Sequence, residues 1–363
     1  MPAENSAAIC VDCRERDAGL DVRNRRLCAP CFTRYVNSKV LKRMESYRFK
    51  NLSGDQKRRL FLPISGGVSS LVLLQILDAQ LQKQIASRNR TAYDLVVARV
   101  ILPEEAHAIT TEEHYSQLAQ RFSTHDFLPL FALHDAIHVD SNIENDFRHL
   151  GMRRQTGESD AAFLGRLLSG TTSVTTRTDL QSIVLRRLLV SAAKEQNCES
   201  VIWGHSDSRL AALSLADVAK GRGGSVPSTI ADGPSMHGIN FNFPARDLFK
   251  AELETYAQAI SDPLLERVLE TEGAMRTPST IRNTSIDDLL RYYITSQSEK
   301  YPSIMANVVR TASKLEPQNM VAKVAACSVC VMPIAGRHES INSDSMLCYG
   351  CERIKQEMKT ELL

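Results

Sequence analysis

The sequence predicts an α/β protein with a parallel-sheet core covered by helices on both faces, a helical C-terminal part and a small metal module near each terminus. Three observations support this prediction. Strand-like apolar runs alternate with helical runs through the middle of the chain, a strand near residue 60 ends in a glycine turn, and eight of the nine cysteines form two quartets. Alternating strands and helices are typical of parallel sheets, whose ligands bind beyond the carboxyl ends of the strands.

The alternation can be followed along the chain from residue 59. The order is strand "RLFLPIS", helix "SSLVLLQILDAQLQKQIASR", strand "YDLVVARVIL", helix "TEEHYSQLAQRF", apolar run "DFLPLFAL", helix "DLQSIVLRRLLVSAAKEQN" and strand "ESVIWGHS". Residues 141–180 and 220–238 are polar and rich in Gly, Ser and Thr, which predicts mobile surface loops. Three helical runs follow residue 246. We therefore expect a metal module with a basic helix over 1–50, the α/β core over 51–245, a helical region over 246–320 and a second metal module over 321–363.

Composition places the chain among globular proteins, since 43% of its 363 residues are hydrophobic and 24% are charged. The longest apolar runs have strand length, and the N-terminal residues lack the features of a secretion signal. We therefore expect no membrane partner, a cytoplasmic location and reduced cysteines, which there serve more often as metal ligands than in disulfides.

The two cysteine quartets have the spacing of metal sites. In the first quartet 14 residues separate two C-x-x-C pairs, and in the second 17 residues do. Each pair places two thiolates on one side of a tight turn, and two pairs complete a closed tetrahedral site. We predict two structural zinc ions, held by Cys10, Cys13, Cys28 and Cys31 and by Cys327, Cys330, Cys348 and Cys351.

A basic segment follows the first quartet. Residues 10–60 hold fourteen Lys and Arg against six Asp and Glu, a net charge of +8. Aromatic residues interleave with the basic ones after residue 31, which suits RNA phosphates and unstacked bases, although such a pattern also fits a solvated helix with a packed face. The candidate tRNA-binding residues are Arg34, Lys39, Lys42, Arg43, Arg48 and Lys50. The two quartets could also pack together into one basic platform.

The glycine turn Ser65-Gly66-Gly67 follows the first strand and precedes a helix. Glycine lets successive backbone N–H groups point into one concavity, and the helix N-terminus adds a partial positive charge, so the turn favours an anion. The turn lacks the Gly-Lys-Ser/Thr ending of the common nucleoside-triphosphate loop. Alone, it is equally explained as a tight strand-to-helix connection.

The wider pattern resembles the PP-loop ATP pyrophosphatase superfamily, whose signature is a strand, S-G-G-x-D-S and a helix. Ser65, Gly66, Gly67 and Ser70 match this signature, and Ser69 stands at the aspartate position. A second match is "VIWGHSDSRLAALSL", which keeps Gly204 and His205 of the family's "GHN-x-x-D" element. Together with the terminal cysteine pairs, the resemblance narrows to the tRNA 2-thiolation group, and is closest to the second subunits of the eukaryotic cytoplasmic complexes.

The resemblance implies chemistry for which this chain lacks several residues. Active members adenylate the wobble uridine with magnesium-bound ATP, and sulfur from a ubiquitin-related modifier then displaces AMP. They carry a central C-x-x-C pair upstream of an Arg-Arg helix, whereas this chain has Ser and Thr before Arg186-Arg187. Ser and Thr hydroxyls cannot replace thiolates in sulfur relay or in iron–sulfur ligation. Cys198 is the only other cysteine, and we interpret it as a packed structural residue. We expect no iron–sulfur cluster and leave ATP and magnesium binding open, with Asp207 as a possible metal ligand.

These departures favour a non-catalytic partner. It would bind tRNA and pair with an active PP-loop paralogue as a heterodimer, and Ser65, Gly66, Gly67, Ser69, Ser70, Gly204 and His205 would form a degenerate nucleotide site. A self-sufficient ATP-dependent tRNA sulfurtransferase and a zinc-dependent RNA-binding module of other purpose remain as alternatives.

Overall fold

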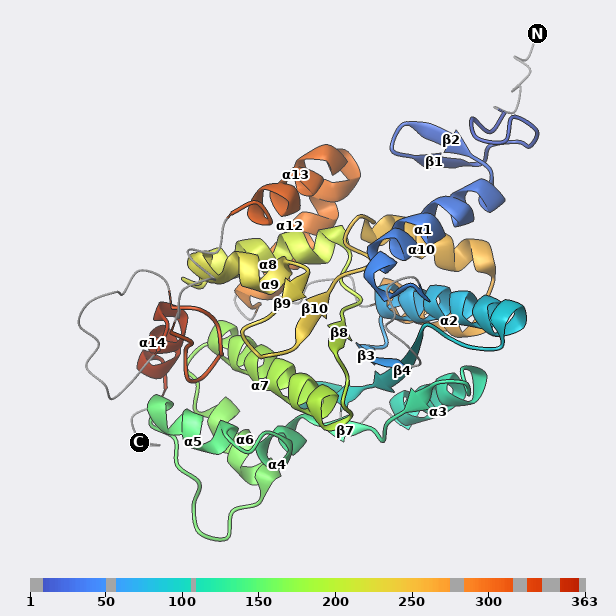
Figure 1. Cartoon of the computed structure of the whole chain (residues 1–363). Helices are drawn as coiled ribbons and strands as arrows, with labels where there is room; N and C mark the ends of the chain where they lie inside the picture. Colours follow the sequence, from blue (N-terminus) through green and yellow to red (C-terminus); the bar gives the residue numbers. More distant parts are fainter. Residues whose placement is uncertain are drawn as a thin grey trace.

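The computed structural model describes residues 9–49, 57–105, 109–274, 284–315, 325–334 and 347–358. A six-stranded sheet lies at the centre in the order β6-β4-β3-β8-β10-β9 (Figure 1). All neighbouring strands in this sheet are parallel except β10 and β9. The predicted α/β fold with a parallel sheet is confirmed.

The elements have the following bounds. The strands are β1 (Leu20–Val22), β2 (Arg25–Leu27), β3 (Arg58–Pro63), β4 (Tyr93–Ala98), β5 (Val100–Ile101), β6 (Asp126–Phe127), β7 (Phe131–Ala132), β8 (Ser200–Ile202), β9 (Gly233–Pro234) and β10 (Asn240–Asn242). The helices are α1 (Ala29–Arg43), α2 (Val68–Arg88), α3 (Ile109–Arg121), α4 (Ala136–Val139), α5 (Ile143–Phe147), α6 (Asp160–Ser169), α7 (Val174–Glu195), α8 (Asp207–Ala219), α9 (Val226–Ile230), α10 (Lys250–Ile260), α11 (Pro263–Ala274), α12 (Ile286–Lys300), α13 (Pro302–Ala312) and α14 (Tyr349–Gln356).

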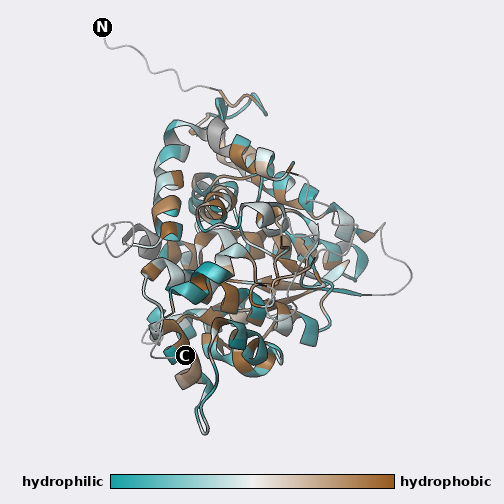
Figure 2. Cartoon of the chain, turned by 90° about the vertical axis from the view of Figure 1, so that its left-hand side faces the viewer, coloured by the Kyte–Doolittle hydropathy of each residue, from teal (hydrophilic) through white to brown (hydrophobic). Residues whose placement is uncertain are grey.

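The sheet buries both of its faces, because successive side chains of a strand point to opposite sides. Leu60 and Leu62 of β3 pack with α1, α2, α10 and α11 on one face. Phe61, between them, packs with α7, α8 and α9 on the other. Such strands read as continuous apolar runs, which is why the sequence predicts them well. Figure 2 shows the resulting pattern, with hydrophobic residues gathered in the interior and hydrophilic ones on outward-facing helix surfaces.

The loop prediction for residues 141–180 and 220–238 is wrong in part. The first stretch contains α5 and α6 and the start of α7, and the second contains α9. Helix α6 buries four apolar residues at helical spacing, namely Phe163, Leu164, Leu167 and Leu168. The Ser159 hydroxyl caps it by accepting a hydrogen bond from the Ala162 N–H, so a residue that suggests a loop in fact begins a helix.

The two cysteine quartets lie at opposite ends of the molecule (Figure 1). The first packs with α1 and α2 in one hydrophobic cluster. The second packs with α4 to α7 in another. The idea that the quartets form a single basic platform is therefore wrong, while the four-part domain division stays a prediction. In the described part of the chain, no helix combines the length and apolarity needed to span a bilayer.

Candidate functional site

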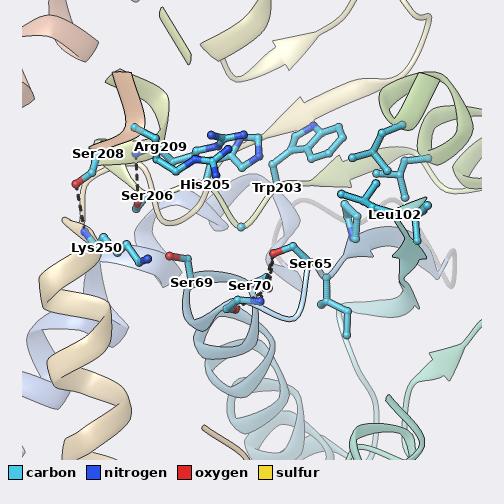
Figure 3. Close-up of a pocket in the computed structure, with 18 of the residues that line it drawn as sticks. Ser65, Ser69, Ser70, Leu102, Trp203, His205, Ser206, Ser208, Arg209 and Lys250 are labelled. Atoms are coloured by element: carbon cyan, nitrogen blue, oxygen red, sulfur yellow. Dashed lines mark hydrogen bonds between the residues drawn. The ribbon is translucent and has the colours of Figure 1, made fainter. Parts of the chain in front are cut away.

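A cavity of about 460 Å³ lies beyond the carboxyl ends of β3 and β8 (Figure 3). The turn after β3 and the loop after β8 form two of its walls, and residues of β4, β5, α7, α8, α10 and α12 complete the lining. Six of the residues predicted from the sequence line it, namely Ser65, Gly67, Ser69, Ser70, Gly204 and His205. Two elements that are far apart in the chain therefore meet at one site.

Two glycines allow close packing at this site. Gly66 has a φ of +78°, and a Cβ atom there would lie 2.8 Å from the Arg99 guanidinium. A Cβ on Gly204 would lie 2.8 Å from the Ser70 Cα, which is backbone and cannot rotate away. Any larger residue at position 204 would therefore push the two loops apart.

The turn itself is organised by its own hydroxyl groups. The Gly67 N–H donates to Ser65 Oγ at 3.3 Å, and Ser70 Oγ donates to the Gly67 carbonyl at 2.9 Å. Gly67 is the N-cap of α2, and no side chain caps this 21-residue helix. Because Ser69 and Ser70 line the cavity, the positive end of the α2 dipole lies at its wall and favours an anion there.

The charged side chains of the cavity are all basic. Among the described residues that line it, none carries a carboxylate, whereas Arg209, Lys250 and Arg291 are cationic. Lys250 points toward Ser69, the position at which the PP-loop signature has its aspartate (Figure 3). Burial, with smaller contributions from neighbouring charges such as Arg291, lowers the pKa of Arg209 to about 10, so its guanidinium stays charged at neutral pH. Magnesium sites in proteins usually include one or two carboxylates, so this cationic lining suits an anion better than a metal.

His205 presents a neutral ring to the cavity. Its imidazole stacks between Trp203, at a centroid distance of 5.5 Å, and Phe243, at 5.8 Å. Burial, and to a lesser degree Arg209 and Arg186, lowers the pKa of His205 to about 3. Neither His205 Nδ1 nor Trp203 Nε1 has a hydrogen-bond partner among the described residues. Buried polar atoms rarely stay unpaired, so these two nitrogens are candidates for contact with a ligand.

Asp207 does not replace the missing aspartate. Ser206, Ser208 and Arg209 line the cavity, but Asp207 does not. Its carboxyl is buried, and burial raises its pKa to about 7 while Arg23 lowers it. A carboxyl that is partly protonated at neutral pH and does not line the cavity is a poor magnesium ligand there.

Each cysteine quartet has the geometry of a site for one tetrahedral ion. The four sulfurs of each group lie within 4.8 Å of one another. Zn–S bonds of ~2.3 Å in a tetrahedron separate the sulfurs by about 3.8 Å. The Cys13–Cys28 sulfur distance is 3.8 Å and the Cys330–Cys348 distance is 3.6 Å, so the thiols fit one metal ion in each group.

The two modules are built alike. In each, the first cysteine pair lies in a turn, and the second pair occupies the N-cap and the first turn of a helix, α1 or α14. An arginine donates to one sulfur of each group, Arg34 to Cys31 Sγ and Arg222 to Cys351 Sγ, both at 3.6 Å.

The Ser/Thr segment before Arg186-Arg187 has a structural role. Ser173 Oγ and Thr176 Oγ1 both donate to the Glu357 carboxylate at the end of α14, the former at 2.7 Å. Cys198 is buried between α7 and β8, and burial raises the pKa of its thiol to about 11. Both observations support the interpretation that this segment and Cys198 are structural.

The candidate tRNA-binding residues differ in how they are held. Arg43 makes two hydrogen bonds to the Asp247 carboxylate, at 2.7 and 2.9 Å. Lys39 lies over the Tyr35 ring. Arg34 contacts Cys31, Arg48 pairs with Glu45 at 3.6 Å, and Lys42 is exposed. Lys50 lies outside the described residues.

The basic side chains of the cavity were not among the predicted site residues. Arg209 and Arg291 lie on α8 and α12, and Lys250 begins α10. The only signal for Arg209 was its position directly after the "GHSDS" segment, and nothing in the sequence links Lys250 or Arg291 to the glycine turn.

Comparison with known proteins places the chain among proteins of tRNA thiolation. The family described as cytoplasmic tRNA 2-thiolation protein 2 matches residues 285–346. The protein of that name from Aspergillus clavatus is 39% identical over 376 residues, covering 99% of this chain and 100% of the relative. That from Coccidioides immitis is 38% identical over 374 residues, covering 96% and 98%.

A solved structure shares the fold. The U34-tRNA thiolase NcsA from Methanococcus maripaludis, solved with its [4Fe-4S] cluster, superposes with a TM-score of 0.59 at 12% identity, covering 96% of both chains. Because identity to the two fungal proteins extends over nearly the whole length, the chain belongs to the cytoplasmic tRNA 2-thiolation protein 2 family.

Proposed function

We propose that this chain is a non-catalytic subunit of a cytoplasmic tRNA 2-thiolation complex, required for 2-thiouridine formation at the wobble uridine. It binds tRNA and pairs with an active PP-loop sulfurtransferase paralogue, to which a ubiquitin-related modifier supplies the sulfur. The names of its relatives support the pathway and the compartment. The observation that supports a non-catalytic role is the cavity, which has a glycine turn and three cations but no carboxylate among its described lining residues.

The chemistry of adenylation explains why this lining matters. Activation of a carbonyl oxygen by ATP requires a metal-bound triphosphate, and proteins usually hold that metal through one or two carboxylates, with phosphates and waters as the other ligands. Lys250 beside Ser69 supplies the opposite charge. The described lining of the cavity therefore offers cations to a phosphate group but no carboxylate to a metal, so the partner carries out catalysis.

The two cysteine quartets hold structural zinc in this proposal. Four thiolates per site close the coordination sphere, so neither ion keeps an open position for catalysis. The N-terminal module presents exposed basic residues, including Arg34 and Lys42, to tRNA phosphates.

Reconstitution tests this function. The full chain, the active paralogue and the pair are each supplied with tRNA, ATP, magnesium and the thiocarboxylated modifier, and 2-thiouridine is measured by mass spectrometry of digested tRNA. We expect full activity only from the pair, and no ATP–pyrophosphate exchange from this chain alone. Exchange by the isolated chain would establish an independent enzyme, and undiminished thiolation in cells lacking it would remove it from the pathway.

A further inference from the structure

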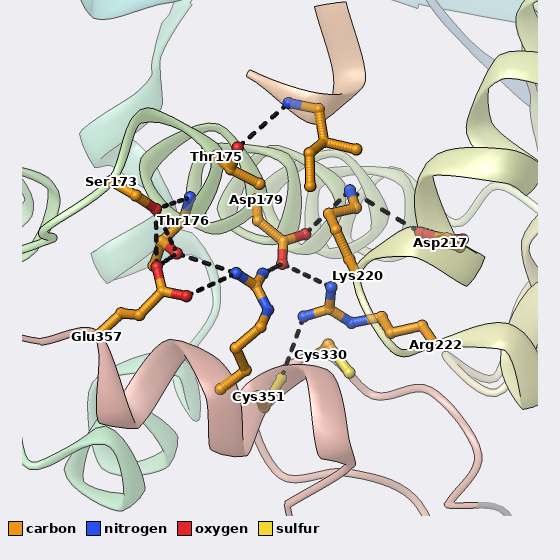
Figure 4. A network of polar contacts seen from close by, with 12 residues as sticks. Ser173, Thr175, Thr176, Asp179, Asp217, Lys220, Arg222, Cys330, Cys351 and Glu357 are labelled. Carbon is orange, nitrogen blue, oxygen red and sulfur yellow. Dashed lines mark hydrogen bonds and ion pairs between the residues drawn. The ribbon is translucent and has the colours of Figure 1, made fainter. Parts of the chain in front are cut away.

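Arg222 connects the C-terminal cysteine quartet to the interior of the protein. Its Nη2 donates to Cys351 Sγ at 3.6 Å, and its Nη1 donates to Asp179 Oδ2 at 2.6 Å (Figure 4). The Arg222 and Asp179 side chains are only 5% and 4% exposed. A guanidinium with this little solvent depends on both of its partners, the Asp179 carboxylate and the Cys351 sulfur, because a buried charge that loses a partner is costly.

Asp179 forms ion pairs with three cationic side chains from different parts of the chain. Besides Arg222, its carboxylate contacts Lys220 Nζ at 3.2 Å and Arg353 Nη2 at 3.2 Å. Lys220 in turn contacts Asp287 Oδ1 at 2.8 Å. Figure 4 shows Asp179, Lys220 and Arg222 between α7, the end of α8 and the helix α14 of the metal module. The Lys220–Asp287 pair extends this buried network to the start of α12.

The same helices line the anion cavity. Helix α7, which holds Asp179, contributes Leu185 and Leu189 to the cavity wall. Helix α12, which holds Asp287, contributes Arg291 one turn further along. Helix α8 begins at the cavity with Ser208 and Arg209 and ends immediately before Lys220. A shift of the network would therefore move the cavity's walls and two of its three cations.

Two further contacts hold the metal module against this network. A Cβ on Gly350, which lies beside Cys351, would be 2.7 Å from Arg222 Cζ, so the guanidinium fits only against a glycine. On α7, Arg187 Nη1 donates to the carbonyls of Ser328 and Val329, at 3.2 and 3.1 Å, in the turn between Cys327 and Cys330. The turn and the helix of the metal module are thus both anchored to the elements that build the cavity.

We propose that Arg222 is a positioning residue through which the metal ion of the C-terminal quartet holds the walls of the anion cavity in place. The ion fixes the Cys351 sulfur, the sulfur and Asp179 fix the guanidinium, and the network fixes α7, α8 and α12. Hydrogen bonds to metal ligands orient the ligand and strengthen metal binding. Loss of the metal should therefore disturb Arg222, and loss of Arg222 should weaken metal binding. The proposal holds whichever anion the cavity takes.

Trp203 provides the readout. It is the only tryptophan of the chain and lines the cavity. In the full-length Cys31→Ser variant, which disables the N-terminal quartet, the remaining metal is removed with a chelator while its release and Trp203 emission are followed together. We expect emission to change with the time course of metal release while helical circular dichroism stays constant. Unchanged emission after complete release would refute the connection.

Two matched pairs of variants isolate Arg222. In the Cys31→Ser chain, Arg222→Gln should speed metal release at least ~10-fold and shift Trp203 emission. Arg34→Gln in a Cys351→Ser chain removes the equivalent N–H to sulfur contact at the N-terminal quartet, and Trp203 emission should equal that of the Cys351→Ser chain itself. Gly350→Ala should act like Arg222→Gln, whereas Gly165→Ala, whose Cβ would meet nothing within 4 Å, should not. Wild-type release rates in both Arg222→Gln and Gly350→Ala would overturn the proposal, and if neither variant folds, the chelation experiment decides.

Discussion

Asp207→Asn should stabilise the protein above neutral pH. Burial raises the pKa of Asp207 from 3.8 to about 7, against the opposing effect of Arg23. The native state therefore keeps a proton that the unfolded chain releases. In that situation the free energy of unfolding falls as pH rises from about 4 to about 7, by about 1.4 kcal/mol per pH unit for one group. Asparagine has nearly the same shape and cannot ionise, so it avoids this loss.

The expected size of the effect follows from the shift. A difference of roughly 3 pKa units corresponds to up to about 4 kcal/mol at pH 8, and to almost nothing at pH 4. Urea unfolding of the wild type and the variant at pH 5, 6, 7 and 8, followed by Trp203 emission and far-ultraviolet circular dichroism, measures it. Asp21→Asn, at an exposed carboxylate, serves as the control. A variant that is less stable than the wild type at pH 8, or a difference that is independent of pH, would show that Asp207 is ionised in the native protein.

Three further predictions concern the site and the surface. Gly204→Ala should lower the free energy of unfolding by ~1–3 kcal/mol, measured by urea titration, because its Cβ would meet the Ser70 backbone; an unchanged midpoint would contradict the tight approach of the two loops. Lys42→Ala should reduce the slope of log binding constant against log salt concentration for tRNA by ~0.9 if Lys42 contacts one phosphate. Arg43→Ala should reduce this slope less, because Asp247 already holds Arg43. Equal slopes for the two variants and the wild type would place tRNA elsewhere. Cys198, whose thiol pKa is raised to about 11, should resist iodoacetamide at pH 8 in the folded protein, and rapid labelling detected by mass spectrometry would argue against its burial.

The strongly patterned elements of the fold are predictable from the sequence. The last four residues of β3 and of β4 are continuous apolar runs because helices cover both faces of the sheet there. Helices α2 and α7 are long enough for helical spacing to be recognised in the sequence. Helix α6 was missed because it is short and begins among polar residues. Its identity rests on Phe163 and Leu167, which pack against segments distant in the chain.

Some residues of the site can be predicted from the local sequence and others cannot. The glycine turn and the "GHSDS" segment carry local signals, because each requires particular residues at adjacent positions. Arg209, Lys250 and Arg291 carry none, because they reach the cavity from three helices whose packing the local sequence does not specify. The charge of the cavity, which decides between an anion and a metal, was therefore not predictable.

The sequence by itself determined the two cysteine quartets, the parallel α/β core and the presence of serine at position 69 of the glycine turn. Each of these depends on residue types at short, regular spacing, where covalent geometry limits the possible structures. Only the tertiary structure decided that the quartets lie at opposite ends, that Lys250 lies beside Ser69 and that Arg222 joins Cys351 to Asp179. These features arise from long-range packing, in which residues tens to hundreds of positions apart come together to bury apolar surface and to pair buried charges.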